Sequence, residues 1–318
     1  MGTQPPPVGG VTTFLRRHLS QLEAAGVPFT ARDWLKMRTM ARLRWLLHIA
    51  ATPKLIRLEF NSYETWTMAA VVLRFFPANI LYRIHSGGPE ARLSPLRRWI
   101  LRRFLKRVNE VVLVGPHVRQ IMIDAGFQLP SNERIEPAFL PPPLGDEEQV
   151  METYGEDGRK FLADHSPLLV IQGSTFGGTT DLYGSDMAVD ALLQLRADYP
   201  RLGLIIGRPI KGSAFFQAHC ARLADMVDEA GAAANMWILD GEREFWPLIK
   251  AAHVFLRPTT SDGDSIGVRE ALFFDIPVVA SDVAPRPPGV RLFPSRDNDA
   301  FARAIRRVLG ETWEDPCS

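Results

Sequence analysis

The stretch VFLRPTTSDGDSIGVREALFFDIPVVASD, residues 254–282, holds the pattern that most clearly indicates the fold. It begins and ends with short apolar runs, which predict two buried strands. Between them, a loop with one glycine leads into a helix predicted over 265–274. Strand, loop, helix and strand in this order form the repeating unit of a parallel sheet. The stretch therefore predicts an α/β fold in which Asp262, Asp264 and Glu270 surround the start of a helix.

The same alternation runs along the whole chain, on both sides of a proline-rich linker at 141–150. The other predicted strands are LIRLEF (55–60), NILYRIH (79–85), EVVLVG (110–115), RIEPAFL (134–140), PLLVIQG (167–173), LGLIIG (202–207) and MWILDG (236–241). Continuous apolar strands are typical of a sheet that is covered on both faces. We therefore expect two Rossmann-like domains, residues 1–145 and 146–318, and a basic amphipathic helix within 31–50.

The bulk composition is that of a packed globular protein, with 318 residues, 46% hydrophobic and 23% charged. The two cysteines, Cys220 and Cys317, are far apart in the sequence and fit no metal-binding spacing. No signal peptide precedes the first predicted element, and no apolar run is as long as a membrane span. We therefore expect a cytoplasmic protein with reduced cysteines.

Charge is distributed unevenly along the chain. Residues 1–110 contain 18 Lys/Arg and 6 Asp/Glu, a net charge of +12, whereas the whole chain has a net charge of +1. In PLRRWILRRFLKR (95–107) the apolar residues share one helical face and the basic residues the other. Basic segments are attracted to anionic lipid by ~1 kcal/mol per Lys or Arg. This favours peripheral docking of the N-terminal domain on the inner membrane face. The alternative is a helix that packs on the sheet with its charges in water. Nucleic acid is not expected, because no recognised binding motif is present.

The acidic residues of the first stretch fit two interpretations. Parallel sheets bind ligands beyond the carboxyl ends of their strands, and a helix N-terminus favours a phosphate. Glu270, inside the predicted helix, can then accept hydrogen bonds from a ribose diol. In the structural alternative, Asp264 or Ser265 caps the helix and the carboxylates pair with Arg257 and Arg269.

The spacing Asp262-x7-Glu270 resembles the E-x7-E motif of retaining GT-B glycosyltransferases, in particular glycosyltransferase family 4 (glycosyl transferases group 1). The resemblance implies a GT-B fold, in which two Rossmann-like domains face each other across a cleft. The N-terminal domain would lie on the acceptor side and the C-terminal domain would bind the nucleotide sugar. It also implies that Glu270 holds the ribose and Asp262 lies near the donor sugar. The backbone that would contact sugar and diphosphate is that of Gly263, Asp264, Ser265 and Ile266.

Two N-terminal segments resemble further parts of the family pattern. PPPVGGVTTF resembles the first loop, whose paired glycines, here Gly9 and Gly10, approach the donor phosphates. ILYRIHSGG resembles the strand whose histidine contacts the donor sugar, which implies this role for His85. The sequence begins almost at the Pro-Gly loop, so we expect the first N-terminal strand of the family's sheet to be missing.

The chain departs from the family at the loop after PLLVIQG. Gly173 can offer its backbone to the donor, but Ser174 and Tyr183 stand where many members have an arginine and a lysine on the diphosphate. The positive charge must then come from other residues. By position alone, the candidates are Arg208 and Arg257, with Lys211 a weaker one.

The resemblance implies a retaining, metal-independent glycosyltransferase of the hexosyltransferase class. Such an enzyme moves a sugar from a UDP- or GDP-sugar, which is a substrate and not a cofactor, to an acceptor hydroxyl. The acceptor would be a glycan or a lipid-linked glycan, in polysaccharide or glycolipid biosynthesis. Two alternatives stay open: a nucleotide-sugar-binding GT-B protein without transferase activity, and a GT-B nucleotide-sugar epimerase.

Overall fold

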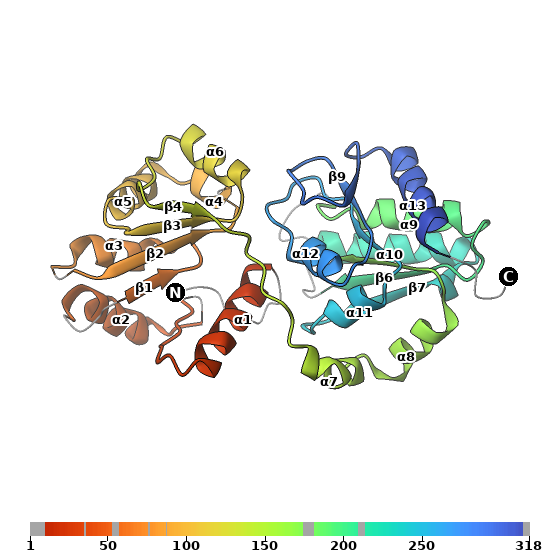
Figure 1. The fold of residues 1–318 in the computed structure, drawn as a ribbon, viewed down its shortest axis with the longest axis horizontal. Helices are drawn as coiled ribbons and strands as arrows, with labels where there is room; N and C mark the ends of the chain where they lie inside the picture. Colours follow the sequence, from red (N-terminus) through yellow and green to blue (C-terminus); the bar gives the residue numbers. More distant parts are fainter. Residues whose placement is uncertain are drawn as a thin grey trace. The chain divides into compact units, whose positions relative to one another are not determined.

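The computed structural model describes residues 10–34, 36–52, 57–75, 77–86, 88–173, 181–208 and 214–313. The chain divides into two compact units, Met1–Leu140 and Pro141–Ser318 (Figure 1). Each unit contains one sheet, and every strand pairing that the structure describes is parallel. The expected α/β fold is therefore confirmed.

The sheet of the first unit follows the order of the chain. Its strands, in spatial order, are β1 (Arg57–Phe60), β2 (Asn79–Ile84), β3 (Glu110–Leu113) and β4 (Glu133–Ile135). Its helices are α1 (Gly10–Ala24), α2 (Thr39–Ala51), α3 (Thr65–Leu73), α4 (Gly88–Ala91), α5 (Pro95–Leu105) and α6 (Pro116–Asp124). Successive right-handed crossovers in one direction place the connecting helices α3, α5 and α6 on the same face of the sheet.

The two faces of this first sheet carry different side chains. Phe60 of β1 and Tyr82 of β2 are fully buried and meet the ring of Phe104 from α5, with ring centroids 4.9 and 5.7 Å apart. Because strand side chains alternate, the preceding Glu59 and the following Arg83 point to the opposite face, where α1 packs. The polar face of this sheet therefore lies under α1, and its apolar face lies under α5.

The second unit has a six-stranded sheet. Its strands, in spatial order, are β10 (Val290–Phe293), β9 (Val278–Ser281), β8 (Val254–Arg257), β5 (Leu168–Gln172), β6 (Gly203–Arg208) and β7 (Met236–Asp240). Its helical segments are η1 (Leu144–Asp146), α7 (Glu147–Glu152), α8 (Gly155–Asp164), α9 (Ser185–Leu195), α10 (Ala214–Glu229), η2 (Ala233–Asn235), α11 (Trp246–Ala251), α12 (Ile266–Phe273) and α13 (Asn298–Thr312).

Both faces of the second sheet are covered, as its continuous apolar strands predict. Leu169 and Ile171 of β5 join a core with α9, α10 and α13, whereas Val170 of the same strand joins a second core with α8, α11 and α12. From β5 the chain builds β6 and β7 on one side and then returns to build β8, β9 and β10 on the other. The topological switch point, where ligands bind in such sheets, therefore lies between β5 and β8.

Several predicted boundaries differ from the structure. The basic helix expected within 31–50 begins only at Thr39. Before it, the Lys36 amide donates to the Asp33 carbonyl and the Met37 amide to the Trp34 carbonyl, which are turn contacts. The predicted linker 141–150 is partly helical, since acidic residues favour the first turn of α7. Helix α8 and strand β10 were not predicted.

The described residues contain neither a membrane-spanning helix nor a metal-binding cluster. None of the described helices has both the length and the apolar character that crossing a lipid bilayer requires. In the same part of the chain, no group of three or more His, Cys, Asp or Glu side chains is arranged to hold a metal ion.

Candidate functional site

The candidate site lies at the switch point of the second sheet. Strand β5 ends at Gln172 and its neighbour β8 ends at Arg257, so both carboxyl ends open onto the same edge. The loop 258–265 follows β8 there, and it is joined to the segment before α9 by a hydrogen bond from the Thr260 amide to the Leu182 carbonyl at 3.0 Å. The residues of the first quoted stretch are therefore placed where this fold binds ligands.

Asp262 is held by two arginines. Its Oδ1 accepts hydrogen bonds from Arg257 Nη2 at 2.9 Å and from the Gly263 amide at 3.1 Å. Its Oδ2 accepts from Arg257 Nε at 2.9 Å and from Arg286 Nη1 at 2.5 Å. Burial raises the pKa of Asp262, but the charges and hydrogen bonds of the two guanidinium groups outweigh it and lower the pKa to about 2.

These contacts bear on the expected place of Asp262 near the donor sugar, which stays a prediction. A carboxylate has about four acceptor positions, and all four are occupied here. A sugar hydroxyl could donate to this carboxylate only if one protein donor were released. In this structure Asp262 acts as a positioning residue that fixes Arg257 and Arg286 at the end of β8.

Arg257 is further packed against the other side of the switch point. Its Nη1 donates to the Gln172 carbonyl at 3.3 Å, and its guanidinium lies 5.0 Å from the ring centre of Tyr183. Gly173 makes room for that ring, because a Cβ atom at this position would lie 2.1 Å from Tyr183. The tyrosine thus occupies a site where the family resemblance would place a cation, and it stacks on the arginine.

Asp181 holds the segment that carries Tyr183. Its carboxylate accepts from the amides of Tyr183 at 3.0 Å and Gly184 at 2.9 Å, and from the Asp186 amide at 3.1 Å. His219 of α10 lies 2.9 Å from the same carboxylate, and both side chains are buried. His219 therefore supports the loop beside the candidate site rather than acting as a metal ligand.

Helix α12 begins as both interpretations predict. Ser265, and not Asp264, is the N-cap, and its Oγ accepts from the Val268 amide at 3.3 Å. Asp264 pairs with Arg269 at 2.6 Å. Together with the bond between Asp262 and Arg257, this confirms the ion pairs of the structural alternative.

Glu270 lies on the buried side of α12, with an exposed fraction of 4%. Its charge reaches Tyr154, whose pKa is raised by burial and also by the Glu270 carboxylate. The Tyr154 hydroxyl donates to the Glu244 carbonyl, in the loop after β7, at 2.7 Å. Glu270 is therefore a buried carboxylate of α12, the helix whose N-terminus lies at the switch point.

Arg208 does not join this group. It makes a bidentate pair with Asp240 at the end of β7, with distances of 2.6 and 2.5 Å. The guanidinium is held toward β7 in this structure, and its expected role at the donor diphosphate stays a prediction. Ser174 and Lys211 lie outside the described residues.

Arg286 is the residue of this site that sequence reasoning missed. Its side chain is 3% exposed, and besides Asp262 it bonds the Ser281 carbonyl and the Thr259 hydroxyl, each at 3.3 Å. In the sequence it is a lone arginine in a proline-rich segment, APRPPG, after the strand PVVASD. The only available signal was its closeness to the carboxyl end of that strand.

His85 of the first unit follows β2 directly, at the carboxyl end of that strand. Its ring packs edge-on against Phe14 of α1, with centroids 5.5 Å apart, and among the described residues its buried Nε2 atom has no hydrogen-bond partner. Burial and the nearby charge of Arg83 lower the pKa of His85 to about 3, so the ring is neutral at pH 7. Gly10 begins α1, and Gly9 lies outside the described residues.

Comparisons with known proteins agree with this fold. Residues 175–311 match the family model described as Glycosyl transferases group 1. No curated protein matches the sequence significantly. Among solved structures, that of Anabaena Alr3699/HepE in complex with UDP-glucose is similar, with a TM-score of 0.67 and 14% identity over 97% of this chain and 88% of that one.

Two other similar structures are named as synthases. Sucrose-phosphate synthase from Thermosynechococcus elongatus has a TM-score of 0.56 and 18% identity, over 90% of this chain and 72% of that one. Trehalose 6-phosphate synthase from Burkholderia multivorans has a TM-score of 0.61 and 13% identity, over 88% and 70%. At such low identity these likenesses concern the fold. Residues 175–311 thus match the glycosyl transferases group 1 family, and the chain has the GT-B fold.

Proposed function

We propose that this protein is a retaining glycosyltransferase of family 4 that moves a sugar from a UDP- or GDP-sugar to an acceptor hydroxyl. One observation carries the proposal. The segment from Asp262 to Glu270 lies at the topological switch point, inside the residues that match the glycosyl transferases group 1 family. A nucleotide diphosphate placed there would meet the N-terminus of α12, where free amides and the helix dipole favour an anion.

The proposed roles follow from this placement. Glu270 holds the ribose, and the backbone from Gly263 to Ile266 contacts the sugar and diphosphate. Asp262 holds Arg257 and Arg286 in place at the carboxyl end of β8. His85, neutral at pH 7, contacts the donor sugar from the first unit.

We propose that the reaction needs no metal ion. Charge that develops on the leaving diphosphate is stabilised by fixed dipoles and cations of the protein. The test is turnover in the presence of excess EDTA, which should be unchanged. A loss of turnover that Mg²⁺ or Mn²⁺ restores would contradict this part of the proposal.

The role of Glu270 is tested with two substitutions and isothermal titration of UDP-glucose and GDP-mannose. Hydrogen bonds to a charged group contribute about 1.5–3 kcal/mol each, so Glu270→Ala should weaken binding of the preferred donor by at least about tenfold. Glu270→Gln keeps the size of the side chain and removes its charge. It should also weaken binding while keeping the thermal unfolding temperature close to that of the parent. Glu229→Gln, on the exposed end of α10, is the matched control.

Unchanged donor affinity in both Glu270 variants would reject the ribose role and favour the structural alternative. The stereochemical part of the proposal has its own readout. Proton NMR of the product formed from an α-linked donor should show an α-glycoside.

A second candidate function is a nucleotide-sugar-binding protein without transferase activity. The observation that favours it is the pairing of the nearby arginines with aspartates, which leaves Arg208 and Arg257 less able to neutralise a leaving diphosphate. Donor binding without hydrolysis or transfer, over a panel of glycan acceptors, would support this candidate.

For the transferase, we propose a glycan or lipid-linked glycan as the acceptor, in polysaccharide or glycolipid biosynthesis. A cytoplasmic enzyme that docks on the inner membrane face would meet such an acceptor there.

A further inference from the structure

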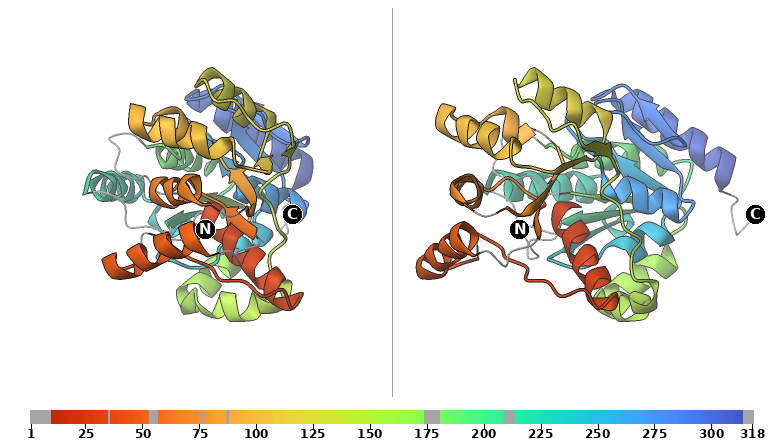
Figure 2. Two further views of the ribbon diagram at one scale, coloured as in Figure 1. Left: turned by 90° about the vertical axis from the view of Figure 1, so that its left-hand side faces the viewer. Right: turned by 60° about the vertical axis from the view of Figure 1, so that its left-hand side comes forward.

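Three helices of the first unit form a row with exposed apolar side chains. Helix α3 packs against both α2 and α5, and Figure 2 shows the three side by side. Their exposed apolar side chains recur at spacings of three, four or seven residues, so they share the outward side of each helix. These are Met40, Leu43 and Leu47 on α2, Trp66 and Leu73 on α3, and Leu96 and Trp99 on α5. Phe75, directly after α3, is 92% exposed.

Within the helices themselves this row has charges of one sign only, and Glu64 lies at its edge as the N-cap of α3. The sequences of α2, α3 and α5 contain no aspartate or glutamate. Part of their positive charge serves the fold. Arg74 donates to the last turn of α2 at Ile49, and Arg107 donates to the Arg74 carbonyl at 2.8 Å. Arg98 donates to the Ala125 carbonyl at 2.7 Å.

The remaining cations of this region lie on the exposed side of α5 and directly after its end. Arg97, Arg102, Arg103 and Lys106 are exposed, and within the described parts of the chain none of them forms an ion pair. The structural alternative of a helix packed on the sheet is correct for the buried face of α5, where Ile100, Leu101, Phe104 and Leu105 lie. It does not account for four unpaired cations beside exposed leucine and tryptophan side chains.

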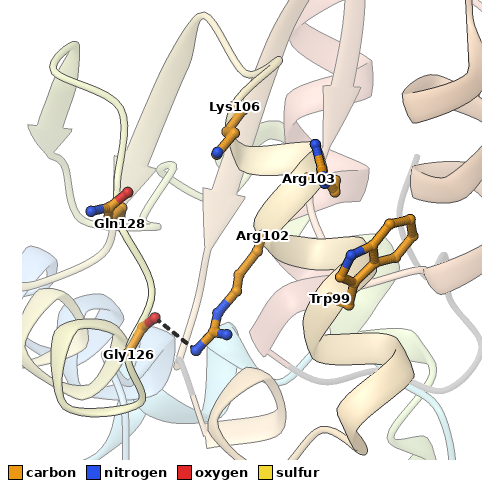
Figure 3. Close-up of a pocket in the computed structure, with 6 residues that line it drawn as sticks. All are labelled: Trp99, Arg102, Arg103, Lys106, Gly126 and Gln128. Carbon is orange, nitrogen blue, oxygen red and sulfur yellow. Dashed lines mark hydrogen bonds between the residues drawn. The ribbon is translucent and has the colours of Figure 1, made fainter.

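Some of these cations line a hollow of about 400 Å³ (Figure 3). Its walls are Trp99, Arg102 and Arg103 of α5, Lys106 directly after it, and Gly126 and Gln128 of the segment that follows α6. The Arg103 guanidinium lies 5.5 Å from the Trp99 ring centre, and Arg102 donates to the Gly126 carbonyl at 3.3 Å. The lining contains three cations and no carboxylate, so it is complementary to a phosphate group.

We propose that the row of α2, α3 and α5 docks on an anionic phospholipid membrane, with a lipid phosphate seated in the hollow beside Trp99. Tryptophan at the edge of an apolar surface is typical of side chains at a membrane interface. An anionic bilayer is also the partner that supplies both negative charge for the arginines and an apolar layer for side chains such as Leu73 and Phe75. Nucleic acid supplies the charge but no such layer. By this surface the transferase would reach a lipid-linked acceptor. That use of the surface rests on the proposed function, whereas membrane binding itself does not.

The test is co-sedimentation of the full chain with vesicles of phosphatidylcholine alone, or of phosphatidylcholine with one third phosphatidylglycerol. Each Lys or Arg near an anionic surface contributes about fivefold to partitioning. The triple variant Arg102→Gln, Arg103→Gln, Lys106→Gln should therefore bind the anionic vesicles about 100-fold more weakly. The control triple Lys160→Gln, Arg303→Gln, Arg307→Gln removes the same charge from exposed positions of the second unit, and it should bind like the parent. Leu73→Ser with Phe75→Ser should weaken binding without changing its dependence on salt.

Several results would overturn the proposal. These are no binding to anionic vesicles at low salt, equal binding to phosphatidylcholine alone, or equal losses in the two triple variants. Tighter binding to double-stranded DNA, insensitive to the changes at Leu73 and Phe75, would assign the surface to nucleic acid instead. Circular dichroism and thermal unfolding of each variant separate loss of docking from loss of folding. Because the assay contains no donor, its outcome is independent of the donor-binding test at Glu270.

Discussion

Substitution of Asp262 by asparagine tests how much the ion pairs of this carboxylate with Arg257 and Arg286 stabilise the folded state. The substitution keeps the shape of the side chain and removes the charge that faces Arg257 and Arg286. Their side chains are only 13% and 3% exposed, so water replaces the lost partner poorly. Removing one member of a buried ion pair costs about 3–5 kcal/mol, because the other charge is left uncompensated.

The pKa of Asp262 gives an independent magnitude. It is lowered from 3.8 to about 2, and one pKa unit corresponds to about 1.4 kcal/mol, so the ionised form is stabilised by about 2–3 kcal/mol in the folded state. Because the folded pKa is the lower one, this contribution is complete above pH 3.8 and is lost as the pH falls toward 2. We therefore expect Asp262→Asn to lower the free energy of unfolding by about 3 kcal/mol at pH 7, and by much less near pH 2.

The assay is urea denaturation at pH 7 and at several pH values down to 2, followed by tryptophan fluorescence. The control is Asp198→Asn, which breaks an ion pair with Arg306 between two half-exposed side chains and should cost less than about 1 kcal/mol. The reasoning is refuted if the two substitutions cost the same, or if the cost of Asp262→Asn does not diminish at low pH.

Two further predictions concern packing. Gly173→Ala should displace the Tyr183 ring, because the new Cβ would lie 2.1 Å from that ring. It should therefore lower both the unfolding temperature and the donor affinity. The control Gly145→Ala, with open space around the new Cβ, should change neither. A crystal structure of Gly173→Ala with the ring unmoved would contradict this expectation. Phe104→Ala should lower the free energy of unfolding of the first unit by about 3–5 kcal/mol, since its ring is fully buried against two aromatic rings of the sheet. A decrease in the free energy of unfolding of less than about 1 kcal/mol, measured by urea denaturation, would show that neighbouring side chains fill the cavity left by the ring.

The periodicity of apolar residues predicted most of the fold, because the pattern that marks a buried strand or helix lies within a short segment of the sequence. The apolar run PLLVIQG became β5, and the run HVFLRP became β8, since each is long enough for one strand and too short for a helix. Weakly apolar elements escaped prediction. Strand β10, VRLF, has only Phe293 buried, and α8 follows a segment whose acidic residues suggested a linker.

The candidate site was predicted in part. The motif from Asp262 to Glu270 was found because its residues are close in sequence and belong to one strand–loop–helix unit. The role of Asp262 near the donor sugar stays a prediction, and the four donors that reach its carboxylate could not be predicted together, because one of them comes from Arg286, which is not its neighbour in sequence. Arg208 was assigned to the donor by position along the chain, but its neighbour across the sheet, Asp240, holds it elsewhere.

The sequence by itself determined the alternating strands and helices, the acidic motif at a strand end, and the concentration of positive charge before residue 110. Each of these depends on side chains that are neighbours along the chain. Only the tertiary structure showed that Arg286, 24 residues after Asp262, closes the cluster at the end of β8. Likewise, only the packing of α3 between α2 and α5 joins three separate stripes into one basic and apolar surface. Such contacts depend on which strands pair and which helices pack together. Local sequence pattern does not show which distant residues meet in this way.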